Sequence, residues 1–497
     1  AGRVAPNATK RGMTMTREGR KRFLCRGALL VALLFLASGC GGGGAPAPEE
    51  SRLQDTRTFT IDAASLPFAA LAGTTAETDR WTGTLGGSGY RVEVPKVWNG
   101  MLVMYAHGYA GTGASLQVTT PIGLRRFLIE NGYAWAASSY DRNYYDVRSG
   151  VEETNALALA FTGIAAANGR PLAPPRKIYI TGHSMGGHVA AAAVEEETQA
   201  AANNKVRYDG AVPLCGNVGD TELFDYFIAA QLAAQQLAGH PAAAFPVENF
   251  AAISRPVRQA LFTAFPAPPL YPAAVTTPAG DTFKGIMRNL TGGTRPLFEE
   301  GFSGPFLGAV WETFGDNGTI RGILNRQGID TKAIVYQFDD DPRLSEEEYA
   351  FNASIVRATR EADANRARRD GLRWVPLLNG QFTVPVVTLH TLGDLYVPFK
   401  MEQVYRKRAD TGSGRDWLVQ RAVRGAAHCD FTAAEQVAAL QAMLDWEQKG
   451  IRPDGDDVLT PATVAAADYG CRFTINALGP DDLLVIGLLR AGLPACR

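Results

Sequence analysis

Ser184 lies in a segment whose residue types and spacing suit a nucleophile. The apolar, β-branched run of residues 177–181 stops at Gly182, Ser184 follows with a second glycine two residues beyond it, and residues 188–194 are rich in alanine. This pattern predicts a strand, a sharp turn and a helix, because glycine tolerates strained backbone and closely approaching chain. The turn would expose the Ser184 hydroxyl and aim the amide of Met185, at the helix N-terminus, at an oxyanion formed there. The alternative is a buried serine in an ordinary strand-to-helix turn.

A serine hydroxyl is a poor nucleophile at neutral pH, so it needs an adjacent base, and the base needs an acid to orient it. The segment around Ser184 resembles the G-x-S-x-G nucleophile elbow of the α/β-hydrolases, which implies the chain order serine, acid, histidine. Of the six histidines, only His390 and His428 follow the long stretch that lacks strand patterns. His390 comes before any acid that could pair in this order and is expected to form a local hydrogen bond at a strand end. We therefore expect His428 to be the general base.

The orienting acid is expected just beyond the strand predicted for residues 384–390. Asp394 occupies this position, and a valine and a proline follow it at 397 and 398. Asp430 is closer to His428 in sequence, but a separation of two residues on one loop rarely gives the geometry that an orienting acid needs. The sequence therefore favours Asp394. A turn aspartate is the alternative, since Gly-Asp is also a common turn sequence.

A second oxyanion donor is expected from the loop after the strand at 101–106. Gly108 lets the chain turn there, and we predict that the amide of Tyr109 is the donor, while its ring either lines the site or only packs. No group of residues has metal-ligand spacing, and no dinucleotide-binding glycine motif follows a strand. The sequence therefore implies no cofactor and no metal.

The elements that position these residues form an α/β pattern. Up to residue 214, strand and helix patterns alternate at βαβ lengths, which predicts a mostly parallel, doubly wound sheet with helices on both faces, as in the α/β-hydrolase fold. The alternation stops over residues 216–383, an insertion too long for an idle loop. We predict a core over 57–215 and 384–497. The insertion would be a large, mainly helical lid above Ser184 or, alternatively, a separate helical domain beside the site.

Two further features of secondary structure are predicted. Ser345 is a suitable N-cap for a helix expected to run from residue 346 to 370. The last helix is expected over residues 431–449, directly after the loop that holds His428.

The N-terminal region has the pattern of an export signal. Residues 1–39 hold eight Lys and Arg against one Glu, and residues 28–37 are an apolar core too short to span a bilayer. Small residues running into Cys40 resemble a bacterial lipobox, which implies lipidation of Cys40; ordinary signal-peptide cleavage nearby is the alternative. The glycine-rich start of residues 40–56 suits a flexible tether. We predict an exported cell-envelope lipoprotein held to a membrane through Cys40, or a secreted protein. The remaining chain is mildly acidic and offers no basic face for nucleic acid.

Four cysteines lie in the body of the chain: Cys215, Cys429, Cys471 and Cys496. An even number in an exported chain predicts two disulfides, for which three connectivities are possible. Four buried free thiols are the alternative.

Two segments resemble the tannase and feruloyl esterase family. They are the pair His428-Cys429 and residues 444–453, which are similar to that family's closing helix and turn. The family also has a cysteine immediately before the nucleophile, bonded to the one after the histidine, but His183 stands there in this chain. The resemblance therefore implies a substitute bond of Cys429 with Cys215, at the same sheet edge, and leaves Cys471–Cys496 as the second pair. A Cys215–Cys429 bond would pin the histidine loop and stabilise the fold by about 4 kcal/mol or more.

Residues 183–187 instead look like exported lipases and polyester hydrolases. The sequence as a whole favours an exported serine hydrolase that cleaves carboxylic esters, of a small molecule or a polymer, through an acyl-enzyme. A serine peptidase of the same fold has the same triad and is the first alternative. A catalytically silent binding protein on the cell surface is the second.

Overall fold

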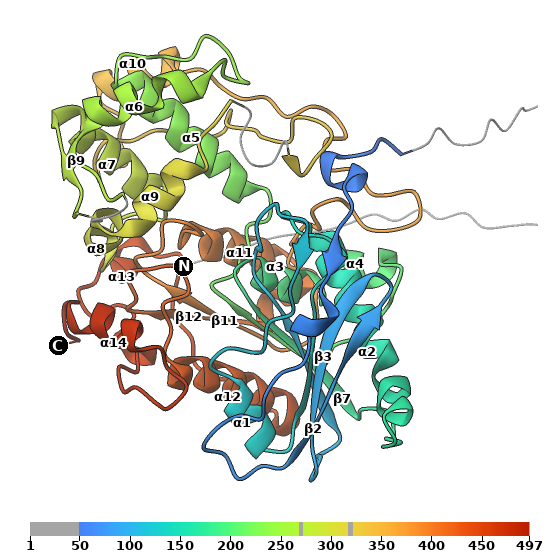
Figure 1. Ribbon diagram of the computed structural model, residues 1–497. Coiled ribbons are helices and arrows are strands. Elements are labelled where there is room, and N and C mark those ends of the chain that lie inside the picture. The colour runs from blue at the N-terminus through green and yellow to red at the C-terminus, as the bar shows by residue number, and fades with distance from the viewer. Residues whose placement is uncertain (1–48, 268–271, 317–321, 497) are drawn as a thin grey trace, which may run out of the picture. The chain divides into compact units, whose positions relative to one another are not determined.

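An eight-stranded sheet forms the centre of the fold, with the strand order β12-β11-β8-β7-β4-β6-β3-β2 (Figure 1). β3 runs antiparallel to both of its neighbours, and the other neighbouring pairs are parallel. This is the topology of the α/β-hydrolase fold, so the predicted fold class is confirmed. The strands are β2 (Thr78–Leu85), β3 (Ser88–Pro95), β4 (Met101–Ala106), β6 (Ala134–Ser138), β7 (Lys177–His183), β8 (Gly210–Leu214), β11 (Val386–Thr391) and β12 (Leu418–Val423).

The computed structural model describes residues 49–267, 272–316 and 322–496. The predicted export signal at 1–39, Cys40 and the first part of the predicted tether, 40–48, lie outside the described residues. Within the described ranges, no helix combines the length and the apolar composition needed to cross a membrane.

Strand alternation creates two hydrophobic cores, one on each face of the sheet. Leu102 and Met104 of β4 belong to a core that also contains residues of α2 (Val147–Ala167), α3 (Met185–Ala192) and α11 (Lys400–Thr411). Val103 and Tyr105 face the opposite side and pack with α1 (Arg125–Glu130) and α12 (Ala433–Lys449). Because successive residues of a strand point to opposite faces, one apolar run supplies both cores.

The insertion between β8 and β11 is mainly helical, as predicted from the sequence. Its helices gather together (Figure 1), and it also contains a short hairpin of β9 (Phe262–Ala264) and β10 (Val275–Thr276). The insertion shares one hydrophobic core with the sheet, and the Tyr226 hydroxyl donates to the carbonyl of Leu395 at 2.8 Å. Its helices are α5 (Glu222–Leu237), α6 (Phe250–Leu261), α7 (Pro278–Leu290), α8 (Phe298–Ser303), α9 (Pro305–Glu312) and α10 (Glu346–Ser354).

The helix predicted over 346–370 is wrong in its length. Ser345 does cap α10, through a capping box with Glu348, but the helix ends at Ser354. Beyond it, the amide of Ala358 donates to Oγ1 of Thr331 at 2.8 Å, and the amide of Thr331 donates to the carbonyl of Ala358 at 3.1 Å. The segment after Ser354 therefore pairs with distant chain in place of forming further helical turns.

Residues 49–56, which the sequence assigned to the flexible tether, belong to the folded body. Arg52 is buried, bonds to Asp146 at 3.1 Å, and stacks on the Trp374 ring. Gln54 donates to the carbonyl of Ile323 in the insertion at 2.9 Å. This segment therefore links the core to the insertion.

A short pair of strands lies outside the central sheet. β1 (Thr60–Ile61) pairs with β5 (Ser115–Leu116) and does not join the central sheet. The remaining short elements are η1 (Leu53–Thr56), η2 (Ala63–Ser65), α4 (Glu196–Ala201), η4 (Ser413–Asp416), α13 (Pro461–Val464), η5 (Cys471–Phe473) and α14 (Leu484–Ala491).

Candidate active site

Ser184 stands on a strained turn between β7 and α3. Its φ of 57° and ψ of −121° lie in a region that residues with a side chain rarely adopt. A Cβ at Gly186 would collide with the carbonyl of Ala106, and one at Gly182 would collide with the carbonyl of Gly186. The two glycines therefore let the helix approach the sheet closely, as the elbow pattern predicted.

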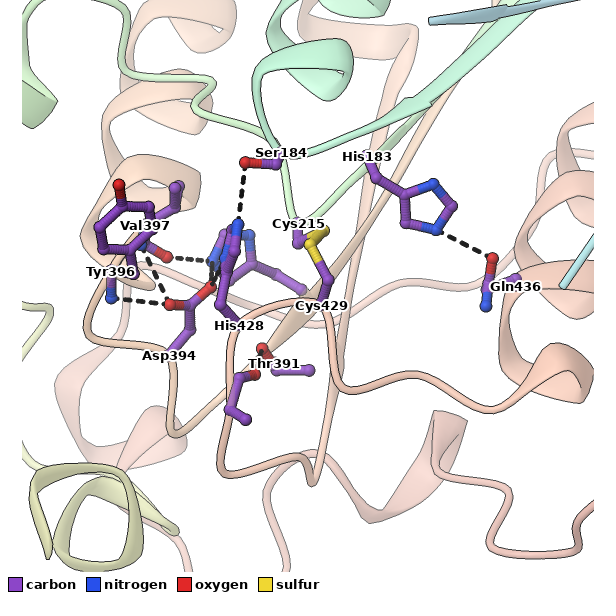
Figure 2. Close-up of a disulfide and its surroundings, with 12 residues drawn as sticks. His183, Ser184, Cys215, Thr391, Asp394, Tyr396, Val397, His428, Cys429 and Gln436 are labelled. Carbon is purple, nitrogen blue, oxygen red and sulfur yellow. Dashed lines mark hydrogen bonds and ion pairs between the residues drawn. A yellow bond between two sulfur atoms is a disulfide. The ribbon is translucent and has the colours of Figure 1, made fainter. Parts of the chain in front are cut away.

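The structure brings the three predicted catalytic side chains together (Figure 2). His428 Nε2 is 2.8 Å from the Oγ of Ser184, and its Nδ1 is 2.6 Å from Oδ2 of Asp394. Asp394 is fully buried, and its other oxygen accepts from the amides of Tyr396 at 2.8 Å and Val397 at 3.0 Å. These two amides fix the carboxylate so that Oδ2 faces the histidine.

Asp430, the nearer acid in sequence, has other partners. It accepts from the amide of Ala426 at 3.2 Å and lies 3.5 Å from the guanidinium of Arg490. It stabilises the histidine loop from within. A second tie comes from β11, where the Thr391 hydroxyl donates to the carbonyl of Ala427 at 2.8 Å.

The loop that carries Tyr109 lies against the nucleophile. A Cβ at Gly108 would lie 3.3 Å from the Cβ of Ser184, so the chain passes directly beside it. His107 is buried, and its ring nitrogens face the carbonyls of Gly108 at 2.7 Å and Ser139 at 3.1 Å, which holds the loop. Met185 begins α3, where a helix has amides without intrahelical partners. The oxyanion roles of the Tyr109 and Met185 amides remain predictions.

His183 forms a network that sequence reasoning did not find. Its Nε2 is 3.0 Å from Oε1 of Gln436 in α12, and its Nδ1 is 3.1 Å from the hydroxyl of Tyr105 in β4 (Figure 2 shows the first contact). Burial lowers the pKa of His183 to about 4, so the ring is neutral at ordinary pH. The only available sequence signal was the type of residue that precedes the nucleophile.

His390 does form the local hydrogen bond predicted for it, and its ring also lies close to a carboxylate of another element. The ring is fully buried, with Nε2 2.8 Å from the carbonyl of Val397 and Nδ1 3.3 Å from Oε1 of Glu402. Burial opposes its positive charge, but the Glu402 and Asp394 carboxylates outweigh that effect, and the pKa of His390 is raised. Glu402 lies in α11, and nothing in the local sequence indicates this pairing.

Both disulfides of the pairing expected from the resemblance are present in the structure. Cys215–Cys429 joins the end of β8 to the residue after His428, with the Cα atoms 5.3 Å apart (Figure 2). Cys471–Cys496 closes a loop at the C-terminus. Cys215, His428 and Cys429 are also close enough to share a metal ion, but the two sulfur atoms are bonded to each other and so are not thiolate ligands.

Aromatic rings flank the histidine. The ring of Tyr396 lies 5.5 Å from that of His428, and the ring of Phe306, from α9 in the insertion, lies 6.2 Å from it. The insertion therefore reaches His428 and supplies part of the wall beside it.

The strand order and the elbow define the α/β-hydrolase fold. No family model matches the chain. The o-phthalyl amidase of Xanthobacter agilis is 23% identical over 454 residues, which cover 79% of this chain and 92% of the amidase. Among solved structures, feruloyl esterase B of Aspergillus oryzae has a TM-score of 0.45 at 15% identity and covers 80% of this chain and 86% of its own. An esterase of Aspergillus oryzae has a TM-score of 0.40 at 13% identity, covering 77% and 83%.

Proposed function

We propose that this protein is a serine hydrolase that cleaves carboxylic esters through an acyl-enzyme. The observation that carries the proposal is the continuous series of hydrogen bonds from Ser184 through His428 to Asp394, with distances of 2.8 and 2.6 Å. A serine bonded to a histidine, which is bonded in turn to a buried carboxylate, is the arrangement that activates a hydroxyl for acyl transfer.

The proposed reaction has two halves, and His428 acts first as base and then as acid in each of them. Nε2 of His428 takes the Ser184 proton as Oγ attacks the carbonyl carbon, and the amides of Met185 and Tyr109 bind the resulting oxyanion. His428 then gives that proton to the departing alcohol, which leaves the acyl group on Ser184. Water deprotonated by His428 attacks the acyl-enzyme, and His428 returns this proton to the Oγ of Ser184 as the Oγ–acyl bond breaks and the acid is released. Asp394 stabilises the imidazolium in both halves.

Ser184→Ala tests the proposal directly. With p-nitrophenyl butyrate, we expect kcat to fall by about 10⁵-fold or more, because the nucleophile is lost. A fluorophosphonate probe should label the wild-type protein at Ser184 and leave the variant unlabelled. Unfolding temperatures of the two proteins should agree, which controls for misfolding. Turnover that survives in a folded Ser184→Ala variant would end the proposal.

Amide hydrolysis is the second candidate, and it includes the peptidase alternative. The matched relative is named an amidase, and the same triad could attack an amide carbon. Turnover of p-nitrophenyl butyrate and of butyryl p-nitroanilide, which share one acyl group, should separate the two. A preference for the ester of about 10³-fold or more in kcat/KM is expected; comparable rates would make the protein an amidase.

We also propose that the protein is exported. Two disulfides are compatible with an oxidising compartment, and the N-terminal sequence pattern is that of an export signal. We further propose that Cys40 is lipidated. Metabolic labelling with a palmitate analogue, compared between wild type and Cys40→Ser, should give a signal only for the wild type.

A further inference from the structure

A cavity of about 440 Å³ lies beside the chain neighbours of Ser184 and His428. Its wall includes His183, the neighbour of Ser184, and Cys429, the neighbour of His428. Gly108 and Tyr109, whose loop passes beside the nucleophile, form another part of the wall. The cavity is therefore bordered by segments adjoining the serine, the histidine and the predicted oxyanion donor.

The C-terminal segment closed by Cys471–Cys496 supplies a further wall of this cavity, through Leu483 and Ile486. The segment is fixed on the core by buried charges. Arg490 of α14 is bonded to Glu435 of α12 at 2.9 Å. A tail held by a disulfide and by a buried ion pair can form a defined binding surface.

The two carboxylates of the wall are already engaged. Asp482 accepts from the amide of Ala433 at 2.6 Å and so occupies the N-terminus of α12. Asp481 is paired with Arg126 at 2.8 Å. Among the residues that line the cavity in the described part of the chain, none is Lys or Arg. An anionic group entering here would meet two carboxylates and no free cation.

Apart from neutral polar groups, the rest of the wall is apolar and aromatic. Tyr105, Tyr109 and Phe431 contribute rings, and Ile122 and Ile486 contribute aliphatic groups. Burial of an apolar group against such a surface is favourable, whereas nothing there compensates a buried charge.

We propose that this cavity binds the uncharged, apolar group on one side of the scissile ester, so that the C-terminal disulfide segment is a substrate-recognition element. The inference rests on the proposed esterase function and adds the chemical class of its substrate: neutral esters that carry an apolar acyl or alcohol group larger than ethyl.

Filling the cavity tests the proposal. Ile486→Trp narrows it, and Leu488→Trp is the matched control, because Leu488 lies in the same helix but is 77% exposed and does not line the cavity. Three esters are compared by pH-stat titration: ethyl acetate, ethyl hexanoate and hexyl acetate. We expect Ile486→Trp to lower kcat/KM at least tenfold for one of the six-carbon esters and less than twofold for ethyl acetate. Ile122→Trp, from a different part of the wall, should reproduce the effect, and Leu488→Trp should not.

The ester that responds shows whether the acyl or the alcohol group enters the cavity. Unchanged rates with both six-carbon esters in the two cavity variants would overturn the proposal. Retained ethyl acetate turnover certifies that each variant is folded. If the wild-type protein hydrolysed none of the three esters, the proposed esterase function itself would be wrong. This outcome differs from unchanged rates in the cavity variants, which would overturn only the role of the cavity.

Selectivity against charge is tested on the side of the ester, acyl or alcohol, that responds to the cavity variants. Ethyl hexanoate is compared with monoethyl adipate or, for the alcohol side, hexyl acetate with 6-acetoxyhexanoate. The anionic ester should have a kcat/KM at least tenfold lower, and Asp482→Asn should narrow that gap. Equal turnover of the neutral and the anionic ester would overturn the predicted substrate class.

Discussion

His183 donates its Nε2 proton to Oε1 of Gln436 across 3.0 Å, so the residue before the nucleophile is bonded to the helix that follows the histidine loop. The amide oxygen can only accept, which leaves Nδ1 to accept from Tyr105. The chain resembles a family in which a disulfide joins the residue before the nucleophile to the residue after the catalytic histidine. Here Cys429 is bonded to Cys215, and the His183–Gln436 hydrogen bond provides a second, non-covalent link between the elbow and the histidine region.

This link should be visible as a coupling energy. His183→Ala leaves the hydroxyl of Tyr105 and the amide of Gln436 without a partner in a buried site, and we expect a loss of about 2–4 kcal/mol in the free energy of unfolding. Urea unfolding of both single variants and of the double variant His183→Ala/Gln436→Ala should give a coupling of about 1 kcal/mol. Strictly additive losses would contradict the link.

The stability of the protein should depend on pH through His183. Its folded pKa of about 4 is below the ordinary value near 6.5, so the unfolded chain takes up the proton first as pH falls. The neutral His183 ring therefore contributes about 3 kcal/mol to the free energy of unfolding. This contribution is complete above pH 6.5 and is lost between pH 6.5 and 4. We expect the unfolding free energy of wild type to fall more steeply over this interval than that of His183→Gln. Parallel curves for the two proteins would show that the pKa of His183 is not lowered in the folded protein.

The Cys215–Cys429 bond should matter for both stability and rate. It closes a sequence separation of 214 residues, so its removal in Cys215→Ser/Cys429→Ser should cost about 5 kcal/mol on chain-entropy grounds. The kcat for a small ester should also fall, because the bond holds the residue after His428. Cys471→Ser/Cys496→Ser is the control, since that loop does not contain a catalytic residue, and its kcat for ethyl acetate should stay within twofold of wild type. Equal kcat losses in both pairs would argue for a general loss of folding.

The sequence predicted the elbow and the three side chains that meet beside it because their signals are local or follow chain order. Ser184 is marked by its glycines, and His428 and Asp394 by their places after the insertion. β12 was missed because buried Gln420 and Arg421 interrupt its apolar pattern; each finds a partner far along the chain. The same reason explains the end of α10 and the pairing of His390 with Glu402. Such pairings depend on tertiary contacts that no local window contains.

Asp394→Asn should separate charge from geometry at the orienting position. The side-chain oxygen of the substituted amide can keep accepting from Tyr396 and Val397, and this places its NH₂ group opposite Nδ1 of His428. A donor there favours the tautomer whose Nε2 carries the proton, which cannot accept from Ser184. We expect a fall in kcat of about 10⁴-fold with little change in unfolding temperature. A loss under tenfold would show that another acid orients the base.

His390 should act as a positioning residue for Asp394. Its Nε2 donates to the carbonyl of Val397, and the amide of the same Val397 donates to Oδ1 of Asp394 at 3.0 Å. His390→Leu removes the donor, whereas His390→Gln can retain one. We expect kcat/KM for ethyl acetate to fall by about 10- to 100-fold in His390→Leu and by less in His390→Gln, because a small displacement of the carboxylate misaligns the base. Equal rates in all three proteins would remove His390 from the site.

The pH profile distinguishes this role from simple packing. The ring also lies 3.9 Å from Oδ2 of Asp394 and faces Glu402, and both carboxylates raise the pKa of His390. Below this raised pKa the ring is positively charged and disfavours a second cation on His428. Both His390→Leu and His390→Gln remove that charge, so the acidic limb of kcat/KM should move to higher pH in both variants, although only His390→Leu loses the hydrogen bond. A limb that stays in place in both variants would mean that His390 is neutral in the folded protein and acts through the hydrogen bond alone.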